Sequence, residues 1–159
     1  MGLMPKALHE GDPAPAIHTQ DDQAKPFDLA SLKGKYVALY FYPKADTPGC
    51  TREAQGFREN SKKFAAAGAV ILGVSPDKPA SLAKFKEKFK LPFTLLSDAD
   101  HKIAQAYGTW VEKSMYGRTY MGMERSTFLI AKDGTIQKIF RKVKPDGHAE
   151  QVLEALQGA

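Results

Sequence analysis

Two continuous apolar runs dominate the hydrophobic pattern of the chain, at residues 36–42 and 69–75. Both are short and rich in aromatic or β-branched side chains, which is typical of strands buried on both faces. Between them, residues at a spacing of three to four positions predict a helix over 48–67: Ala54, Phe57, Ser61 and Phe64. Gly68 supplies a C-terminal stop for this helix.

The second half of the chain continues this alternation. We predict helices over 79–89 and 100–107 with a short strand at 94–96 between them. Residues 126–131 and 135–141 predict two strands joined by the turn Lys132-Asp133-Gly134, and a last helix covers 147–156. This order predicts an α/β fold in which helices flank a central mixed β-sheet, with a thioredoxin-like closing hairpin and helix. We expect one domain over 1–159, with residues 1–11 frayed.

Composition narrows the class of protein. The chain has 159 residues, of which 43% are hydrophobic and 26% charged, as in a soluble globular domain. No apolar run approaches the roughly 20 residues that span a bilayer, so no membrane association is expected. Residues 1–6 lack the apolar core of a secretory signal. We therefore expect a cytoplasmic protein.

The net charge of +5 raises the possibility of a nucleic-acid partner. The basic residues are interleaved with acidic ones, as in the stretch 84–88, which indicates a solvated helix face. No nucleic-acid-binding motif is present, so we expect no such partner. Salt-sensitive retention on DNA would reveal one.

The sequence contains a single cysteine, Cys50. An intramolecular disulfide and a zinc site built on paired cysteines are both excluded. The four histidines lie far apart without an i,i+4 pair, so we expect no metal site and assign them solvated or capping roles. No glycine-rich phosphate loop indicates a nucleotide, and we expect no cofactor.

Cys50 lies just after the start of the helix predicted from residue 48, which follows the buried strand predicted at 36–42. Thr47 has the character of an N-cap and Pro48 that of a first helical residue, so Cys50 falls in the first turn. Free backbone N–H groups and the positive end of the helix dipole favour a thiolate there, and the thiolate is the nucleophilic form. A lone cysteine is also commonly a small buried apolar residue. The local residues leave both interpretations open.

The segment around Cys50 matches a known pattern. Pro43, Thr47 and Cys50 fit P-x-x-x-T-x-x-C, and the stretch 40–51 resembles peroxiredoxins of the bacterioferritin-comigratory protein, or peroxiredoxin Q, subfamily. A second match is Met115-Tyr116-Gly117 followed by the stretch 124–130, and the resemblance extends from about residue 12 to the C-terminus. It implies a thiol-dependent peroxidase that reduces hydrogen peroxide and organic hydroperoxides through a cysteine sulfenic acid.

The resemblance also implies roles for four residues. Cys50 would attack the peroxide, and Thr47 would hydrogen-bond it. Arg125 would stabilise the thiolate and the developing alkoxide, and Pro43 would shield the sulfur from water. Each residue also has an ordinary structural role as the alternative. Cys50 could be a buried thiol and Thr47 a helix cap. Arg125 could form a surface ion pair and Pro43 could end the strand.

One departure from the subfamily changes the expected cycle. Many members carry a resolving cysteine five residues after the first, where this chain has Gln55, and the helix predicted over 79–89 has none either. We therefore expect a one-cysteine enzyme reduced by an external thiol: thioredoxin, glutaredoxin or a low-molecular-weight thiol such as glutathione. The resemblance favours a monomer.

Two further expectations complete the sequence-based picture. Trp110, Met115, Met121 and Met123 are expected to serve local side-chain packing, or to form an apolar rim that favours organic peroxides. The alternative function is a non-catalytic thioredoxin-like module that binds a partner and in which Cys50 is structural.

Overall fold

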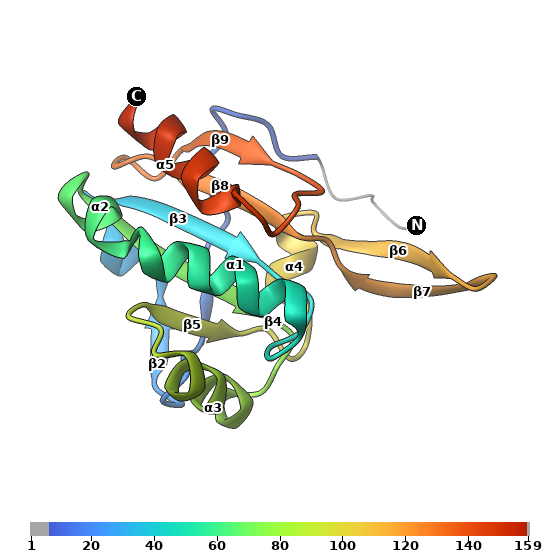
Figure 1. Cartoon of the computed structure of the whole chain (residues 1–159). Helices are drawn as coiled ribbons and strands as arrows, with labels where there is room; N and C mark the ends of the chain where they lie inside the picture. The colour runs from blue at the N-terminus through green and yellow to red at the C-terminus, as the bar shows by residue number, and fades with distance from the viewer. Residues whose placement is uncertain (1–6, 159) are drawn as a thin grey trace.

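A five-stranded mixed sheet forms the centre of the computed structural model, which describes residues 7–158 (Figure 1). Its strands are β3 (Tyr36–Phe41), β4 (Ala69–Ser75), β5 (Thr94–Ser97), β8 (Ser126–Ile130) and β9 (Ile136–Phe140). They lie in the order β5-β4-β3-β8-β9. Strands β3, β4 and β5 are parallel, whereas β8 runs antiparallel to both β3 and β9. The predicted mixed sheet is confirmed.

Helices cover both faces of this sheet (Figure 1). They are α1 (Pro48–Glu59), α2 (Ser61–Ala66), α3 (Pro79–Phe89), α4 (Lys102–Ala106) and α5 (His148–Gln157). Alternation along β3 divides the core: Ala38 and Tyr40 face the side of α1, α2, α3 and α5, whereas Val37 and Leu39 face the side of α4. Because both faces are buried, β3 needs a continuous apolar sequence. Among residues 7–158, no helix is long and apolar enough to cross a membrane.

Two small antiparallel ribbons were not expected from the hydrophobic pattern. Strands β1 (His18–Gln20) and β2 (Pro26–Asp28) form one, followed by the short 3-10 helix η1 (Leu29–Leu32). Strands β6 (Trp110–Met115) and β7 (Arg118–Met123) form the other, which projects from the body (Figure 1). Most of its side chains are exposed, so no buried face imposes an alternating pattern on the sequence.

The long helix predicted over 48–67 is wrong in one respect, because it is divided into α1 and α2 at Asn60. The side-chain amide of Asn60 donates to the carbonyl of Gly56 at 2.8 Å. The backbone N–H of Asn60 shares this acceptor at 3.2 Å, and Asn60 has φ −101° and ψ 5°, outside the regular helical range. Asparagine side chains compete for backbone groups in this way, which favours a helix end. Phe57 of α1 and Phe64 of α2 still belong to the same core cluster, as their spacing of seven residues predicts.

The N-terminal region and one histidine also differ from expectation. Of the segment expected to fray, residues 1–6 lie outside the described part of the chain. Within the rest, the backbone N–H of Gly11 donates to the carbonyl of Ile136 at 2.7 Å, so this residue is tied to the sheet. His148 is fully buried instead of solvated, with Nε2 at 2.7 Å from the hydroxyl of Thr127. Burial lowers the pKa of His148.

Candidate active site

Cys50 is the third residue of α1, at the carboxyl end of β3. In sheets of this kind, functional groups collect just beyond the carboxyl ends of parallel strands. The antiparallel register of β3 and β8 pairs Phe41 with Ser126, which brings Arg125 to the same edge of the sheet. Two segments that are 75 positions apart in sequence, 125 − 50, therefore meet there. Only 1% of Cys50 is exposed.

The loop between β3 and α1 is held by contacts from α3 and from the end of β4. The backbone N–H of Ala45 donates to Oδ2 of Asp77 at 2.8 Å. The ammonium of Lys88 lies 2.9 Å from Oδ2 of Asp46, a residue with a positive φ of 62°. Since the loop is fixed at two points, the start of α1 has a defined position relative to the sheet. Sequence reasoning missed the role of Asp77, for which the local pattern gives no signal.

Thr47 begins α1, but its side chain is used differently from the prediction. Its backbone is extended, as at an N-cap, and its carbonyl accepts the first helical hydrogen bond from Thr51 N at 2.8 Å. The hydroxyl donates to the carbonyl of Lys44 at 2.8 Å and does not cap the helix. The expected capping by the side chain is therefore wrong. Pro48 is at the first helical position, as predicted.

Arg125 and Glu53 form a partly buried ion pair beside Cys50. Nη1 of Arg125 donates to Oε1 of Glu53 at 2.7 Å. Nη2 of Arg125 lies 3.3 Å from the place that a Cβ on Gly49 would occupy, so the guanidinium sits against the first turn of α1. Burial opposes the charge of Arg125, but the attraction of Glu53 and Cys50 outweighs it, and the pKa of Arg125 is raised.

Glu53 is a second residue beside Cys50 that sequence reasoning missed. It lies one turn after Cys50, and its carboxyl group is buried with no hydrogen-bond partner at Oε2. Burial raises the pKa of Glu53 to about 7, although Arg125 lowers it through both its charge and its hydrogen bond. The available signal was its position: Glu53 precedes Ala54 and lies one helical turn before Phe57, on the apolar side of α1. A carboxyl group buried there needs a positively charged or hydrogen-bonding partner.

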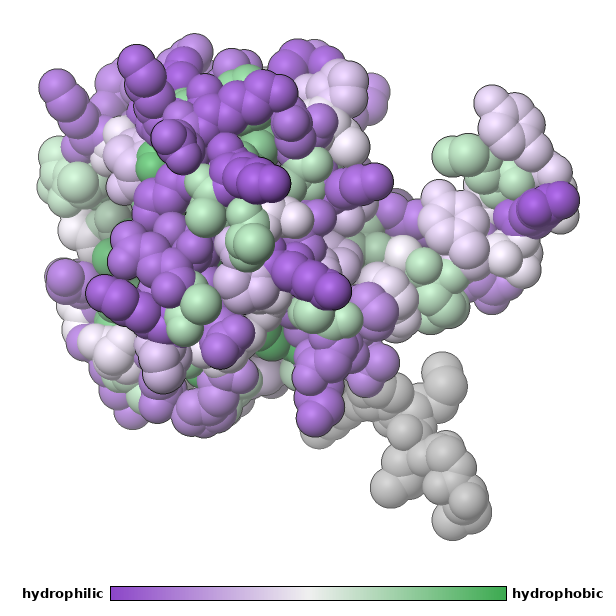
Figure 2. All heavy atoms as spheres, turned by 90° about the horizontal axis from the view of Figure 1, so that it is seen from below, coloured by the Kyte–Doolittle hydropathy of each residue, from purple (hydrophilic) through white to green (hydrophobic). Residues whose placement is uncertain are grey.

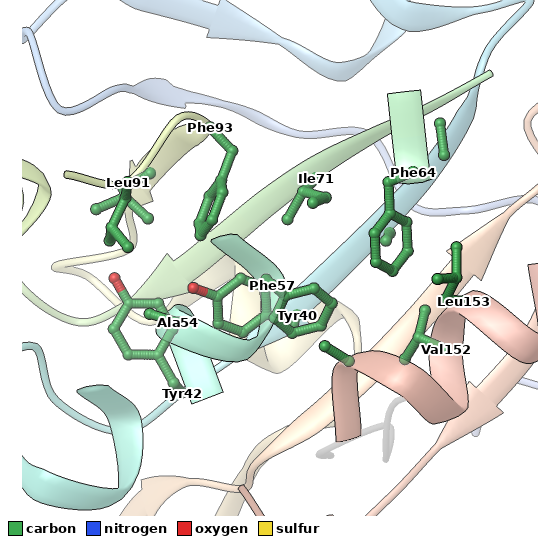
Figure 3. Packing of buried hydrophobic residues seen from close by; sticks show 14 of the residues in the cluster. Tyr40, Tyr42, Ala54, Phe57, Phe64, Ile71, Leu91, Phe93, Val152 and Leu153 are labelled. Carbon is green, nitrogen blue, oxygen red and sulfur yellow. The ribbon is translucent and has the colours of Figure 1, made fainter. Parts of the chain in front are cut away.

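Aromatic rings of β3 form the floor beneath this part of α1. The rings of Tyr40 and Phe57 stack with centroids 4.5 Å apart, and Tyr42 stacks on Tyr40 at 5.3 Å. Figure 3 shows these rings together with Ala54 in the core below α1. Water is excluded from this side of the site, which strengthens the electrostatic interactions among Cys50, Arg125 and Glu53.

The four residues singled out from the sequence come from two segments. Pro43 follows β3 and is partly buried, Thr47 precedes α1, and Cys50 lies in the first turn of α1. Arg125, directly before β8, lies against this first turn. Arg125 lies close enough to Cys50 that a negative charge on the sulfur contributes to the raised pKa of the guanidinium. A nucleophilic sulfur held beside a guanidinium, at a helix N-terminus, is suited to attack an electrophile whose leaving atom becomes negative.

Comparisons with known proteins show the family of the chain. Residues 10–139 match the model of the AhpC/TSA family. The chain is 49% identical to peroxiredoxin Bcp of Bacillus subtilis, over 92% of this chain and 93% of that protein. It is 45% identical to peroxiredoxin Bcp of Escherichia coli, over 94% of this chain and 96% of that protein.

Solved structures give the same result. Peroxiredoxin Q of Xanthomonas campestris superposes with a TM-score of 0.86 at 40% identity, covering 89% of this chain and 90% of that one. A peroxiredoxin Q variant from Xylella fastidiosa superposes with a TM-score of 0.91 at 34% identity, covering 96% and 98%. The predicted thioredoxin-like fold is confirmed. The chain belongs to the AhpC/TSA family, within its peroxiredoxins of the Bcp and Q type, and is a thiol-dependent peroxidase.

Proposed function

We propose that Cys50 is the peroxidatic cysteine of this enzyme. Its thiolate attacks the terminal oxygen of a hydroperoxide, the O–O bond breaks, and the sulfur becomes a sulfenic acid while an alkoxide or hydroxide leaves and takes up a proton. The observation that carries this proposal is the position of the Cys50 sulfur: it lies in the first turn of α1 and interacts with the charge of Arg125. Both features favour the thiolate.

Three further residues are proposed to shape the reaction. Arg125, oriented by Glu53 through the 2.7 Å hydrogen bond, stabilises the thiolate and the oxygen that leaves. Thr47 turns its hydroxyl from the carbonyl of Lys44 to the bound peroxide, because a hydroxyl rotates easily between acceptors. Pro43 covers the approach from the end of β3 and keeps bulk water from the sulfur.

An external thiol is proposed to complete the cycle. The chain has Gln55 where many relatives have a second cysteine, and Cys50 is the one cysteine of its 159 residues. An incoming thiol would form a mixed disulfide with the sulfenic acid and release water, and a second thiol would then restore Cys50. Because Cys50 is only 1% exposed, the first turn of α1 must open locally for this exchange. Thioredoxin, glutaredoxin and glutathione-like thiols are the candidate reductants.

Organic hydroperoxides are proposed as substrates beside hydrogen peroxide. The related bacterioferritin comigratory protein of Xanthomonas campestris has alkyl peroxide reduction activity. In this chain the hairpin β6–β7 ends two residues before Arg125 and exposes Met115 and Met121 to solvent, whereas Met123 is buried in the core. We also propose that the enzyme is monomeric and cytoplasmic.

Rapid mixing tests the proposal. The protein is mixed with equimolar hydrogen peroxide, and loss of the Cys50 thiol is followed in time. We expect oxidation orders of magnitude faster than that of an ordinary thiol, and Thr47→Val and Arg125→Ala each slow it by on the order of a hundredfold. Arg52→Ala is the matched control, since this exposed arginine lies two residues from Cys50 and pairs with Asp146 instead.

The alternative is a partner-binding module in which Cys50 is structural. Its near-complete burial fits that alternative as well. A structural thiol does not need a guanidinium and a carboxylate beside it, and burying them is costly. Oxidation at the rate of an ordinary thiol, unchanged in all three variants, would establish the module instead.

A further inference from the structure

Lys113 reaches from the hairpin β6–β7 toward the active site. In the register of the hairpin, Lys113 pairs with Tyr120 and Val111 with Gly122, so these side chains share one face. The stem of Lys113 lies across Gly122: a Cβ on that glycine would be only 3.1 Å from Cδ of the lysine. Glycine at position 122 therefore leaves room for the Lys113 side chain to turn back toward the base of the hairpin. The hairpin itself projects from the body (Figures 1 and 2).

The ammonium of Lys113 ends at the backbone corner that presents Arg125. Its Nζ donates to the carbonyl of Met123 at 2.6 Å. In the next residue, the N–H of Glu124 donates to the carbonyl of Thr109 at 2.7 Å. The carbonyl of Arg125 accepts from Val143 N at 3.0 Å. Three consecutive residues, 123–125, are thus each held by a hydrogen bond to their backbone, and of these three bonds the one from Lys113 comes from a charged side chain.

The electrostatic surroundings of Lys113 connect it to the catalytic group. Burial lowers its pKa first, and the guanidinium of Arg125 lowers it further. Glu124 and Cys50 act in the opposite direction. Lys113 is therefore within the same set of mutually interacting charges as Cys50, Arg125 and, through Arg125, Glu53. A lysine whose side chain pointed from the hairpin into solvent would be fully solvated, and its pKa would not depend on Arg125 or Cys50.

We propose that Lys113 is a positioning residue of the active site, which fixes the corner at Met123 and adds a second positive charge to the field acting on Cys50. This inference rests on the proposed role of Cys50. It assigns a catalytic purpose to the β6–β7 hairpin, whose strand register carries Lys113 to the base of β8. It also explains why a two-stranded ribbon with few buried side chains has a glycine at position 122.

The test compares Lys113→Met, Lys113→Arg and wild type by the rate of Cys50 oxidation with hydrogen peroxide over a range of pH. We expect Lys113→Met to slow the reaction at neutral pH on the order of tenfold and to raise the pH of half-maximal rate by up to about one unit. Lys113→Arg retains charge and hydrogen bonding, so it should stay within about threefold of wild type. Lys102→Met is the control, since Lys102 lies on α4 and is highly exposed.

A second variant addresses the path of the side chain. Gly122→Ala retains every charge but displaces the stem of Lys113, and it should change the rate in the same direction as Lys113→Met by a smaller factor. Thermal unfolding of each variant shows whether it folds.

The outcomes separate the two proposals. If wild type itself reacts like an ordinary thiol, the proposed role of Cys50 fails. If wild type is fast and Lys113→Met has the same rate and pH profile, the inference about Lys113 is refuted. It is also refuted if Lys113→Met is slow with an unmoved pH profile and Lys113→Arg is equally slow, because the lysine would then act only as structural support.

Discussion

Replacing Glu53 by glutamine should stabilise the protein, and by an amount that depends on pH. The carboxyl group of Glu53 is buried, and its pKa is raised from the usual 4.5 to about 7, first by burial. Between these two values the folded protein binds the proton more tightly than the unfolded chain does. The free energy of unfolding therefore falls as pH rises through this window. Glutamine resembles the protonated carboxyl group and removes this dependence.

The size of the effect follows from the shift in pKa. A difference of 2.5 units between about 7 and 4.5 corresponds to about 3 kcal/mol, at 1.36 kcal/mol per unit. Glu53→Gln should therefore match wild type below about pH 4.5 and exceed it by up to about 3 kcal/mol above pH 7. Glutamine still offers an oxygen to Arg125, so the guanidinium keeps its hydrogen-bond acceptor at Oε1.

Urea unfolding at a series of pH values from 4.5 to 8 measures this difference. Glu59→Gln is the matched control, because Glu59 lies on the same helix but is exposed, and its replacement should change stability by less than about 0.5 kcal/mol at any pH. A constant difference between Glu53→Gln and wild type across the series would refute the reasoning. So would a glutamine variant that is less stable than wild type at pH 8.

Three other predictions concern side-chain packing and the missing second cysteine. Gly73→Ala should lower the free energy of unfolding by about 1–3 kcal/mol, because the new Cβ would lie 3.0 Å from the ring of Tyr40 in the centre of the sheet. Gly56→Ala makes only an ordinary contact and should be neutral or stabilising by up to about 1 kcal/mol. Urea unfolding compares the two variants, and equal costs would contradict the prediction. Tyr40→Phe should stabilise by about 1 kcal/mol in the same assay, since the buried hydroxyl has no hydrogen-bond partner, and a loss of stability would show that it has one. Gln55→Cys should form a disulfide with Cys50 after peroxide treatment, and the helical circular dichroism signal should fall. The reason is that Cα atoms five residues apart on a helix are roughly 8.7 Å from each other, whereas a disulfide spans at most about 7 Å. A disulfide that forms with full helicity would argue against local opening of α1.

Several features were accessible from local sequence. The run over 36–42 predicts β3 because a strand buried on both faces must be apolar throughout. Pro48 fixes the start of α1, and this start places Cys50 in the first turn. These are local properties of the backbone and its immediate neighbours. The alternating order of strands and helices then restricts the fold to a mixed sheet with helices on both faces.

Other features depended on contacts between distant segments. The break at Asn60 follows from a side-chain hydrogen bond that competes with the helix, and the hairpin β6–β7 has little buried surface to impose a pattern. The hydroxyl of Thr47 turned to the carbonyl of Lys44 rather than to the helix, which residue type alone does not decide.

The sequence by itself therefore singled out Cys50 as the candidate nucleophile, placed it in a helix, and determined that the chain has no second cysteine. The tertiary structure decided which charges surround that nucleophile. Arg125 meets Glu53 because β8 pairs with β3 in one register, and the Lys113 side chain crosses Gly122 to reach the carbonyl of Met123, two residues before Arg125. Electrostatic interactions depend on distance and burial, and both are set by strand pairing and side-chain packing between segments far apart in the chain.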